Sequence, residues 1–443
     1  MQNFFTPKSI AVIGVSKDTN KVGHVIFKNL YQKFKTYPIH PLETSILGQK
    51  VYSSIEKVQG KIDLAIIAIP APFVIHAVNE CGKKGVKHII LVTSGFKEIG
   101  NTHLEYELSK ALEHYDIKCV GPNCLGVFDA HSGLDSLFLP IRKMNRPKAG
   151  GISFISQSGA VGSAVLDLLA EESLGFAKFI SYGNAANLSE TDFLEYLGKD
   201  TQTKVICMYI EGIHDGKKFL RIAKNIKKPI ILIKGGKSQR GAHATLSHTG
   251  SLAGSYEIYK GACTQAGIIV ADSLEEVFHI AKLFVMLPKP KGNRVQVITN
   301  GGGYGILTID ELETQKIPLA DMTPKTRAFL KHHVPKIVSI SNPMDLVGDA
   351  TNERYGLALK MCVDDKNIDV IVLIILHQTP LIDENIINLV AAHKGKKPII
   401  VLSVGGKQTA ILSKKMEAQH IPVFAFPKDA VSALKKWYTF FNV

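Results

Sequence analysis

Short runs of apolar, mostly β-branched residues alternate along the chain with stretches whose apolar residues recur at helical spacing. The runs end in glycine, proline or small polar residues, as buried strands do. Strands that alternate with amphipathic helices predict mostly parallel sheets with both faces covered, so we expect an α/β protein. The clearest strand candidates are residues 10–13, 64–69, 88–92, 152–155, 205–210, 230–233, 295–298, 370–376 and 399–404.

Two stretches rich in proline and basic residues, 139–148 and 288–293, read as linkers. A chain of 443 residues is too long for one ordinary core. The linkers therefore predict three α/β units of similar size.

The second and third units resemble each other. Residues 151–159 (GISFISQSG) parallel residues 294–302 (RVQVITNGG), and residues 228–237 (KPIILIKGGK) parallel residues 397–407 (KPIIVLSVGGK). An internal repeat of this kind predicts two copies of one fold.

The two copies differ in one insertion. From Lys407 the third unit needs 13 residues to reach His420, whereas the second needs 30 residues from Lys237 to reach Gly267. The 17 additional residues include the polar, glycine-rich segment 244–254 (ATLSHTGSLAG). Loops carry sites that a scaffold holds, so the insertion is a candidate active loop, although drift in a surface loop would leave the same pattern.

A glycine turn follows the first predicted strand. Gly14, Val15 and Ser16 end the strand, and Lys21 and Gly23 open a helix. Backbone N–H groups at a helix N-terminus suit a phosphate group. A tight strand-to-helix turn without a ligand is the alternative.

A second turn of this type spans residues 156–162 (SQSGAVG). Ser156 or Ser158 is suited to cap the helix that follows, and the glycines permit close backbone approach to an anion. A well-capped helix explains the same residues.

Two nucleotide motifs are excluded. Ser16 and Thr19 stand where the dinucleotide fingerprint has its later glycines, and His40 follows the second strand without a ribose-binding acid. Ile231 stands where a P-loop ending in Lys237 would need its first glycine. An NAD-dependent oxidoreductase is therefore disfavoured.

His248 lies in the insertion among small polar residues, unlike an apolar core histidine. Glu211 ends the strand 205–210, where an acid can accept a hydrogen bond from an imidazole and strengthen its other nitrogen as a nucleophile. An exposed carboxylate that closes a strand is the alternative for Glu211. No nucleophile-elbow or zinc-protease motif is present.

Composition narrows the class further. The chain is 45% hydrophobic and 21% charged and has no apolar run long enough to span a membrane, so we expect a cytoplasmic protein. Its six cysteines lack metal-binding spacing, so we expect reduced thiols and no metal site. The net charge of +14 comes from scattered basic pairs rather than a continuous basic face. A polyanionic small molecule or an acidic partner explains this surplus as well as a nucleic acid does, so charge alone does not decide. Because no nucleic-acid-binding motif accompanies the charge, we expect no nucleic acid.

Together these segments resemble the α subunit of the nucleoside-diphosphate-forming, that is ADP-forming, acetate–CoA ligases, which are relatives of the succinyl-CoA synthetase α subunit. The resemblance spans essentially the whole chain in one order. It is carried by residues 13–16, 21–23, 121–126, 156–160, 182–184, 211–212, 247–250 and 342–346.

The resemblance implies a Rossmann-like CoA-binding domain followed by two flavodoxin-like domains. The boundaries that we expect are 1–130, 145–287 and 293–443, with the phosphohistidine loop in the second domain.

The resemblance also implies roles for single residues. His248 matches the phosphorylated histidine and Glu211 the carboxylate that positions it. The expected CoA-binding residues are Gly14, Val15, Ser16, Lys21, Gly23, Ile69, Pro70, Thr93, Ser94, Gly95 and Phe96. The residues expected around phosphate and acyl phosphate are Asn123, Cys124, Ser156, Gln157, Ser158 and Gly159.

The implied reaction is acyl-CoA + ADP + phosphate ⇌ acid + CoA + ATP, through an acyl phosphate and a phosphohistidine. Because the chain has no ATP-grasp domain of its own, we expect ADP or ATP and Mg²⁺ on a separate β subunit, in a hetero-oligomer. A CoA-binding regulatory subunit without turnover is the alternative, and the sequence leaves the acyl group open.

Overall fold

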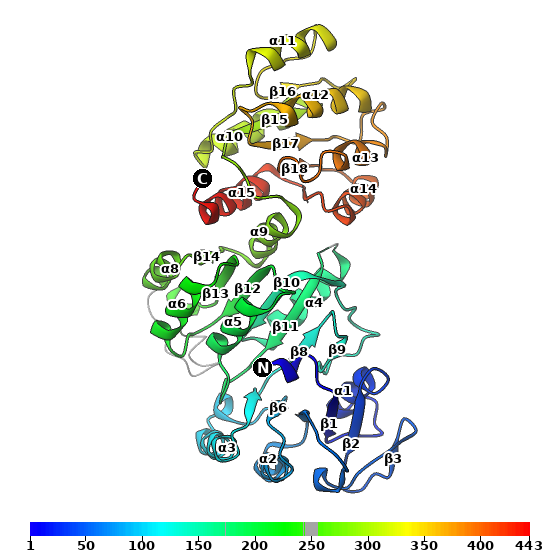
Figure 1. Ribbon diagram of the computed structural model, residues 1–443, viewed down its shortest axis with the longest axis vertical. Coiled ribbons are helices and arrows are strands. Elements are labelled where there is room, and N and C mark those ends of the chain that lie inside the picture. Colours follow the sequence, from blue (N-terminus) through cyan, green and yellow to red (C-terminus); the bar gives the residue numbers. More distant parts are fainter. Residues whose placement is uncertain (173, 242, 244–255) are drawn as a thin grey trace. The chain divides into compact units, whose positions relative to one another are not determined.

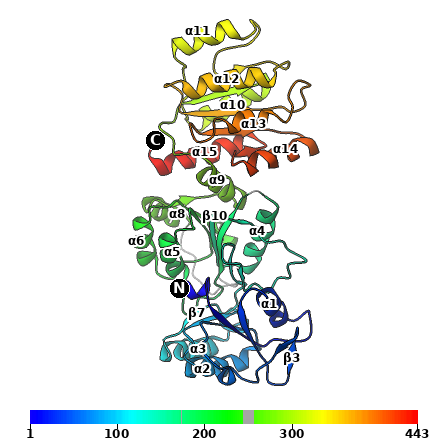
Figure 2. The same cartoon turned by 45° about the vertical axis from the view of Figure 1, so that its right-hand side comes forward.

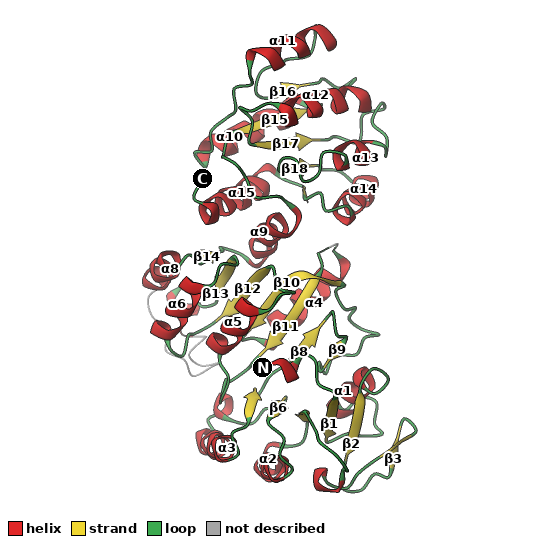
Figure 3. Ribbon diagram, in the orientation of Figure 1, coloured by secondary structure: helices red, strands yellow, loops and turns green. Residues whose placement is uncertain are grey.

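The structure is a computed structural model that describes residues 1–172, 174–241, 243 and 256–443. It divides into two compact units, Met1–Ala271 and Asp272–Val443 (Figure 1). Helices and strands alternate in both units (Figure 3), and the sheets are mostly parallel, which confirms the predicted fold class. All nine predicted strands are present, with ends that differ by up to three residues.

The first sheet of unit 1 has five parallel strands in the order β2-β1-β5-β6-β7. Tyr52 adds a parallel bridge to Ile39 beyond β2, so the order corresponds to a Rossmann sheet with a vestigial third strand. From β1 the chain adds β2 on one side and then β5 on the other, so the strand order reverses between β1 and β5. Open α/β sheets bind ligands at such a switch point, beside the carboxyl ends of the strands. The strands are β1 (Ser9–Ile13), β2 (Lys35–Ile39), β5 (Leu64–Ile67), β6 (His88–Leu91) and β7 (Lys118–Val120).

Helices cover this sheet, and short elements connect it. The helices are α1 (Val22–Leu30), α2 (Val74–Lys83) and α3 (Thr102–His114). The short elements are the 3-10 helices η1 (Gln2–Phe4), η2 (Ile55–Lys57), η3 (Ala71–Phe73) and η4 (Lys97–Ile99), and the hairpin β3 (Ser45–Ile46) with β4 (Gln49–Lys50).

The second sheet of unit 1 has seven strands in the order β14-β13-β12-β10-β11-β8-β9, with β8 and β9 antiparallel to their neighbours. Helices α5 and α6 lie on one side of these strands and α4 on the other (Figure 2). The strands are β8 (Gly126–Asp129), β9 (Leu134–Asp135), β10 (Ala149–Ser156), β11 (Phe176–Ser181), β12 (Val205–Ile210), β13 (Ile230–Lys234) and β14 (Ile269–Val270). The helices are α4 (Gly159–Glu171), α5 (Glu190–Lys199), α6 (Gly216–Asn225) and α8 (Tyr256–Gln265).

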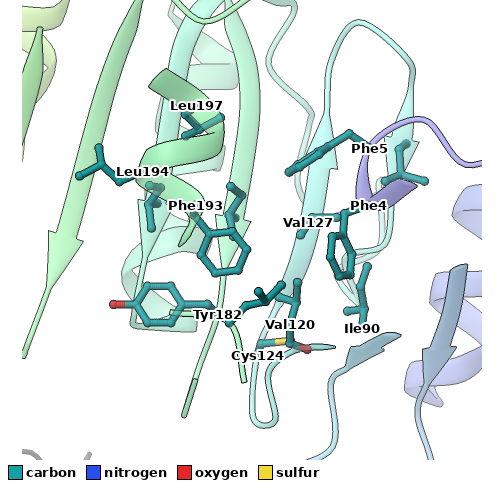
Figure 4. Close-up of a cluster of buried hydrophobic side chains, with 14 of the residues drawn as sticks. Phe4, Phe5, Ile90, Val120, Cys124, Val127, Tyr182, Phe193, Leu194 and Leu197 are labelled. Carbon is teal, nitrogen blue, oxygen red and sulfur yellow. The ribbon is translucent and has the colours of Figure 1, made fainter. Parts of the chain in front are cut away.

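One hydrophobic core joins the two sheets of unit 1. Phe4 and Phe5 of the N-terminal segment, Ile90 and Val120 of the first sheet, and Tyr182 beside the second belong to the same buried cluster (Figure 4). Because this core is continuous, the carboxyl ends of the first sheet and the loops of the second are held in one body.

A buried ion cluster supports the second sheet. The Nζ atom of Lys178 on β11 donates to both carboxylate oxygens of Asp200 at 3.1 Å and lies 3.5 Å from Oδ2 of Asp129 on β8. The Lys178 side chain is 2% exposed. A buried charge of this kind is tolerated because it is paired and hydrogen-bonded.

Unit 2 is a five-stranded parallel sheet in the order β16-β15-β17-β18-β19 with helices around it. The strands are β15 (Val295–Thr299), β16 (Met344–Asp345), β17 (Val370–Ile374), β18 (Ile399–Leu402) and β19 (Val423–Phe424). The helices are α9 (Leu274–Met286), α10 (Gly302–Thr314), α11 (Pro324–His333), α12 (Asn352–Asp364), α13 (Ile386–Ala391), α14 (Lys407–Ala418) and α15 (Pro427–Phe441).

The structure confirms the internal repeat. The order β14-β13-β12-β10 in unit 1 corresponds to β19-β18-β17-β15 in unit 2. The side-chain contacts repeat as well: Ser156 Oγ donates to the Ser158 carbonyl at 2.7 Å, and Thr299 Oγ1 donates to the Gly301 carbonyl at 3.0 Å.

The remaining expectations from composition concern membranes, thiols and metals. Across the described part of the chain, no helix combines the length and apolarity needed to cross a bilayer. All six cysteines are buried free thiols. The described residues contain no cluster of three or more His, Cys, Asp or Glu side chains placed to hold a metal ion.

Candidate active site

A cleft of about 1240 Å³ lies in unit 1 at the carboxyl ends of β1, β5 and β6. Its walls come from the loops and helices of the first sheet, from the N-terminal turn of α4, which packs on the second sheet, and from the segment after β9. Both turns that the sequence marked as phosphate-type therefore open into one cleft.

The turn after β1 is built from two glycines. Gly14 has φ +93°, and a Cβ added at Gly23 would overlap the Gly14 carbonyl, so the first turn of α1 packs directly on the end of β1. The His24 ring Nδ1 lies 2.7 Å from the Ser16 carbonyl and fixes the turn from behind. Lys21 precedes the helix without a side-chain cap, and Val22 and Gly23 line the cleft. This arrangement fits an anionic group.

The turn after β10 places a second helix N-terminus at the cleft. Ser158 caps α4, with Oγ accepting from the Val161 N–H at 3.3 Å. Ser158 and Gly159 line the cleft, whereas Ser156 is buried behind them and donates to the Ser158 carbonyl. Ser156 therefore supports the turn rather than facing the cleft.

Gln157 connects the cleft to Glu211. Its side-chain Oε1 accepts from the backbone N–H groups of Glu211 at 2.8 Å and Gly212 at 3.1 Å. The backbone N–H of Gln157 donates to the Tyr209 carbonyl. Since Oε1 is used in this way, the amide nitrogen of Gln157 is the polar group left to face the cleft that this residue lines.

Glu211 is buried at the end of β12 and is not one of the residues that line the cleft. The Tyr209 hydroxyl donates to its Oε1 at 3.2 Å. Lys234 Nζ donates to the Glu211 carbonyl at 2.7 Å and to the Gly235 carbonyl at 2.6 Å. Burial lowers the pKa of Lys234, while the Glu211 carboxylate acts in the opposite direction. The Glu211 turn is thus held from both sides.

Cys124 lines the cleft as a neutral thiol. Burial raises its pKa to about 12, and its Sγ donates to the Leu91 carbonyl at 3.3 Å. A thiol in this state is a poor nucleophile. Cys124 therefore contributes shape rather than covalent chemistry.

Asn123 belongs to a polar network that the sequence did not indicate. Its Nδ2 donates to Asn184 Oδ1 at 3.2 Å, and Asn184 Nδ2 donates to Glu98 at 2.6 Å and Glu105 at 3.0 Å. The Nζ atom of Lys97 lies 3.3 Å from Oε1 of Glu105. Burial opposes ionisation of Glu98, but hydrogen bonds from the Gly95 N–H and the Asn184 amide prevail and lower its pKa. Asn123 and Asn184 lie in the segments 121–126 and 182–184 that carried the resemblance, but nothing in the sequence indicated their contacts with Glu98 and Glu105.

The predicted CoA-binding residues divide into two sets. Nine of the eleven line the cleft: Gly14, Val15, Ser16, Lys21, Gly23, Ile69, Pro70, Thr93 and Ser94. The other two, Gly95 and Phe96, are not part of its lining: Phe96 is fully buried, and the Gly95 N–H donates to Glu98. Of the predicted phosphate residues, all but Ser156 line the cleft.

His248 and the rest of the segment 244–255 lie outside the described residues. The pairing of His248 with Glu211 thus stays a prediction.

Several lining residues were missed from the sequence. They are Ser53 and Ser54 after the β3–β4 hairpin, Phe73, His76 and Glu80 around the start of α2, and Phe138 and Leu139 after β9. No short motif marks them, because the fold brings them to the cleft from separate loops and from the helices η3 and α2.

Three domain families match the chain in order. Residues 8–130 match a CoA binding domain, residues 149–284 the flavodoxin domain of succinyl-CoA ligase type, and residues 295–440 a ligase-CoA domain.

Whole-chain relatives agree with these matches. The chain is 39% identical to the α subunit of acetate–CoA ligase [ADP-forming] II of Pyrococcus furiosus, over 97% of this chain and 95% of that one. It is 40% identical to acetate–CoA ligase [ADP-forming] I of Archaeoglobus fulgidus, over 98% of this chain but only 63% of that longer chain.

A solved structure shares the fold of the whole chain. The dinucleotide-forming acetyl-coenzyme A synthetase 1 of Ca. Korarchaeum cryptofilum, in complex with phosphate and ADP, has a TM-score of 0.93 and 35% identity, and the match covers 100% of this chain and 97% of that one. The chain belongs to the family of α subunits of ADP-forming acetate–CoA ligases.

Proposed function

We propose that this chain is the catalytic α subunit of an ADP-forming acyl-CoA synthetase. It would convert acyl-CoA and phosphate to CoA and an acyl phosphate, and then pass the phosphoryl group through His248 to ADP. The observation that carries the proposal is the single cleft into which the N-termini of α1 and α4 both open.

In the first step, a phosphate oxygen attacks the thioester carbonyl, the C–S bond breaks, and CoA leaves as the thiol with the proton that phosphate releases. The α1 turn with Lys21 suits the phosphates of CoA, and the α4 turn suits the attacking phosphate. Backbone N–H groups of α4 and the side-chain amides of Gln157 and Asn123, which line the cleft, would stabilise the oxyanion that forms on the carbonyl.

In the second step, neutral His248 takes the phosphoryl group and releases the carboxylate. Glu211 would orient the imidazole and stabilise its charge, and the Tyr209 hydroxyl, Lys234 and Gln157 hold the Glu211 turn. Covalent catalysis of this kind divides one difficult transfer into two easier ones.

In the third step, phosphohistidine meets ADP on an ATP-grasp β subunit that also holds Mg²⁺. The Pyrococcus furiosus relative that matches this chain nearly end to end is named as an α subunit. That name supports a second subunit, to which we assign the nucleotide. The reaction fits the cytoplasm predicted from the sequence.

The test is acid-labile labelling of the chain with its β partner, using acetyl-CoA and ³²P-phosphate. We expect label on the wild type, loss of label in His248→Asn, and retention in the matched control His243→Asn. A wild type that takes no label would overturn the proposal. Tight CoA binding by calorimetry without label would favour the regulatory subunit instead.

A further inference from the structure

Two side-chain amides that line the cleft each keep one polar atom without a protein partner. Gln157 is 7% exposed; its Oε1 holds the Glu211 turn, and its Nε2 donates to no described residue. Asn123 donates from Nδ2 to Asn184, and its Oδ1 accepts from no described residue. Neither atom is one of the fully buried polar atoms that lack a partner, so both are reached from the cleft.

Asn123 lies close to the turn that opens α4. Leu125, two residues further along the chain, has its Cβ 3.8 Å from where a Cβ on Gly159 would stand. The backbone carbonyl of Asn123 packs against Gly183, since a Cβ there would stand 2.2 Å from that oxygen. Gly183 follows β11, whose end pairs with the end of β10 just before the α4 turn. The segment with Asn123 therefore runs beside this turn.

Two carboxylates decide which end of the Asn123 amide is left for the cleft. Asn184 Nδ2 donates to Glu98 Oε2 at 2.6 Å and to Glu105 Oε2 at 3.0 Å, so both of its hydrogens are used. Burial opposes ionisation of Glu98, but its hydrogen bonds prevail and lower its pKa, and an ionised carboxylate only accepts. Asn184 therefore turns Oδ1 toward Asn123, whose Nδ2 meets it at 3.2 Å. This leaves Asn123 Oδ1 on the far side of the amide from Asn184.

The α4 turn supplies hydrogen-bond donors to the same cleft. The N–H groups of Gly159 and Ala160, both in the lining, have no acceptor within the helix. The Nε2 of Gln157 adds a further donor. An oxyanion held by these groups would also meet the Asn123 oxygen. Two acceptors that face each other are unfavourable unless one of them carries a proton to donate.

We propose that Asn123 Oδ1 accepts the hydroxyl of hydrogen phosphate at the α4 turn and thereby selects phosphate against sulfate. At pH 7.5 sulfate has the same tetrahedral shape and double charge as hydrogen phosphate but carries no proton. Asn184, Glu98 and Glu105 act as positioning residues that hold the Asn123 amide. The second Nδ2 hydrogen of Asn123 remains for the oxyanion of the thioester carbonyl. The inference rests on the proposed function, because it takes phosphate as the anion at this turn.

Competition against phosphate tests the inference. The chain and its β partner form ATP from acetyl-CoA, ADP and varied phosphate at pH 7.5, with sulfate or arsenate added. For the wild type we expect a competitive Ki for sulfate at least tenfold above the KM for phosphate, since a site that hydrogen-bonds a hydroxyl rejects the analogue that lacks it. Arsenate is larger than phosphate but protonated like it, so its Ki should lie within about threefold of that KM.

Asn123→Gly removes the acceptor without straining the backbone, because Asn123 has φ +56°, a conformation that glycine adopts readily. We expect the KM for phosphate to rise at least tenfold while the Ki for sulfate changes less than threefold. The value of kcat should fall as well, since Asn123 also serves the oxyanion. The ratio of the two constants is therefore the readout, and a purely structural role would not move it.

A second variant keeps the test open if Asn123→Gly fails to fold. Glu98→Gln combined with Glu105→Gln keeps the side-chain volumes but allows both groups to donate, so Asn184 and Asn123 can turn over. We expect the preference for phosphate to fall at least threefold. The matched control combines Glu107→Gln with Glu113→Gln, two exposed acids of α3 outside the cleft lining, and should keep the wild-type ratio.

A wild-type Ki for sulfate less than tenfold above the KM for phosphate would overturn the inference. So would an arsenate Ki as high as that of sulfate, or a preference that neither variant changes. In each case the wild type still forms ATP, and the proposed function stands. A wild type that forms no ATP with its β partner would instead overturn the proposed function, and the inference with it.

Discussion

The side-chain oxygen of Gln157 accepts the backbone N–H of Glu211 at 2.8 Å, across 54 residues of sequence. Gln157 lines the cleft beside the α4 N-terminus, and Glu211 is the buried carboxylate at the end of β12. One amide therefore fixes the position of the carboxylate relative to the predicted phosphate site.

Gln157→Ala should weaken both stability and phosphoryl transfer. Removing Oε1 leaves the N–H groups of Glu211 and Gly212 without this acceptor, which we expect to lower the free energy of unfolding by about 1–3 kcal/mol. The amount of ³²P label on His248 should fall more than it does in a variant that is destabilised to the same degree elsewhere in the chain. Urea unfolding and ³²P labelling are the two measurements.

The repeat supplies the matched control. Asn300 Oδ1 accepts the Leu376 N–H at 3.0 Å, the same contact in unit 2. We expect Asn300→Ala to lose similar stability and to keep its label. If both variants lost label equally, the contact would be structural only.

Glu211→Gln keeps the volume and the backbone contacts but removes the charge. If Glu211 orients and stabilises the imidazole of His248, phosphohistidine formation should slow by roughly 10²–10⁴-fold, the range for groups that act on a catalytic histidine. CoA affinity should stay unchanged. Single-turnover labelling measures the first quantity and calorimetry the second, and a wild-type rate in this variant would remove Glu211 from the mechanism.

Cys124→Ala should retain phosphoryl transfer within about tenfold, because a thiol with a pKa of about 12 is almost entirely protonated at neutral pH. In the folded chain, iodoacetamide should leave Cys124 unmodified between pH 7 and pH 9, and urea should expose it to the reagent. Mass spectrometry of the Cys124 peptide is the check. Rapid modification near pH 8 in the folded chain would show a reactive thiolate instead.

The same raised pKa predicts a loss of stability in alkali. The folded chain holds the Cys124 proton up to about pH 12, whereas the unfolded chain releases it near its ordinary pKa of about 8.5. The contribution of this thiol to the free energy of unfolding is therefore complete below pH 8.5 and decreases above that pH by about 1.4 kcal/mol per pH unit. Urea unfolding at pH 8, 9 and 10 should show a shallower decline in Cys124→Ala than in the wild type, and equal slopes would contradict the prediction.

Lys178→Met should destabilise unit 1 strongly. It leaves the buried carboxylate of Asp129 and the partly buried carboxylate of Asp200 without their cation, which costs about 3–5 kcal/mol. Lys199→Met is the control, since the Lys199–Glu195 pair is exposed and contributes about 0–1 kcal/mol. Urea unfolding measures the free energy of unfolding of both variants. Similar losses in the two variants would contradict the stabilising role of the Lys178 cluster.

Local patterns were enough to predict the strands and the two glycine-containing turns that connect β1 to α1 and β10 to α4. Runs such as 205–210 are apolar throughout because parallel strands are covered on both faces. The repeat was visible because residues 151–159 parallel residues 294–302 and residues 228–237 parallel residues 397–407. Gln157 and Asn300 occupy matching positions in the first pair, and the structure shows that both hold the turn after a neighbouring strand.

Contacts between distant segments could not be predicted in this way. The network from Asn123 through Asn184 to Glu98 and Glu105 joins four separate segments. Residues 139–148 looked like a linker because proline and basic residues dominate them, yet Leu139 and the preceding Phe138 line the cleft, and Arg146 binds Asp135. Such placements depend on tertiary folding rather than on local propensity.

The most direct test of the central claim is to locate the transferred phosphoryl group. The chain and its β partner are incubated with acetyl-CoA and phosphate, digested at alkaline pH, and analysed by tandem mass spectrometry. The account predicts one phosphorylated histidine, His248, whose phosphate disappears when ADP is added and ATP forms. Turnover of acetyl-CoA to ATP without phosphate on His248 would contradict it.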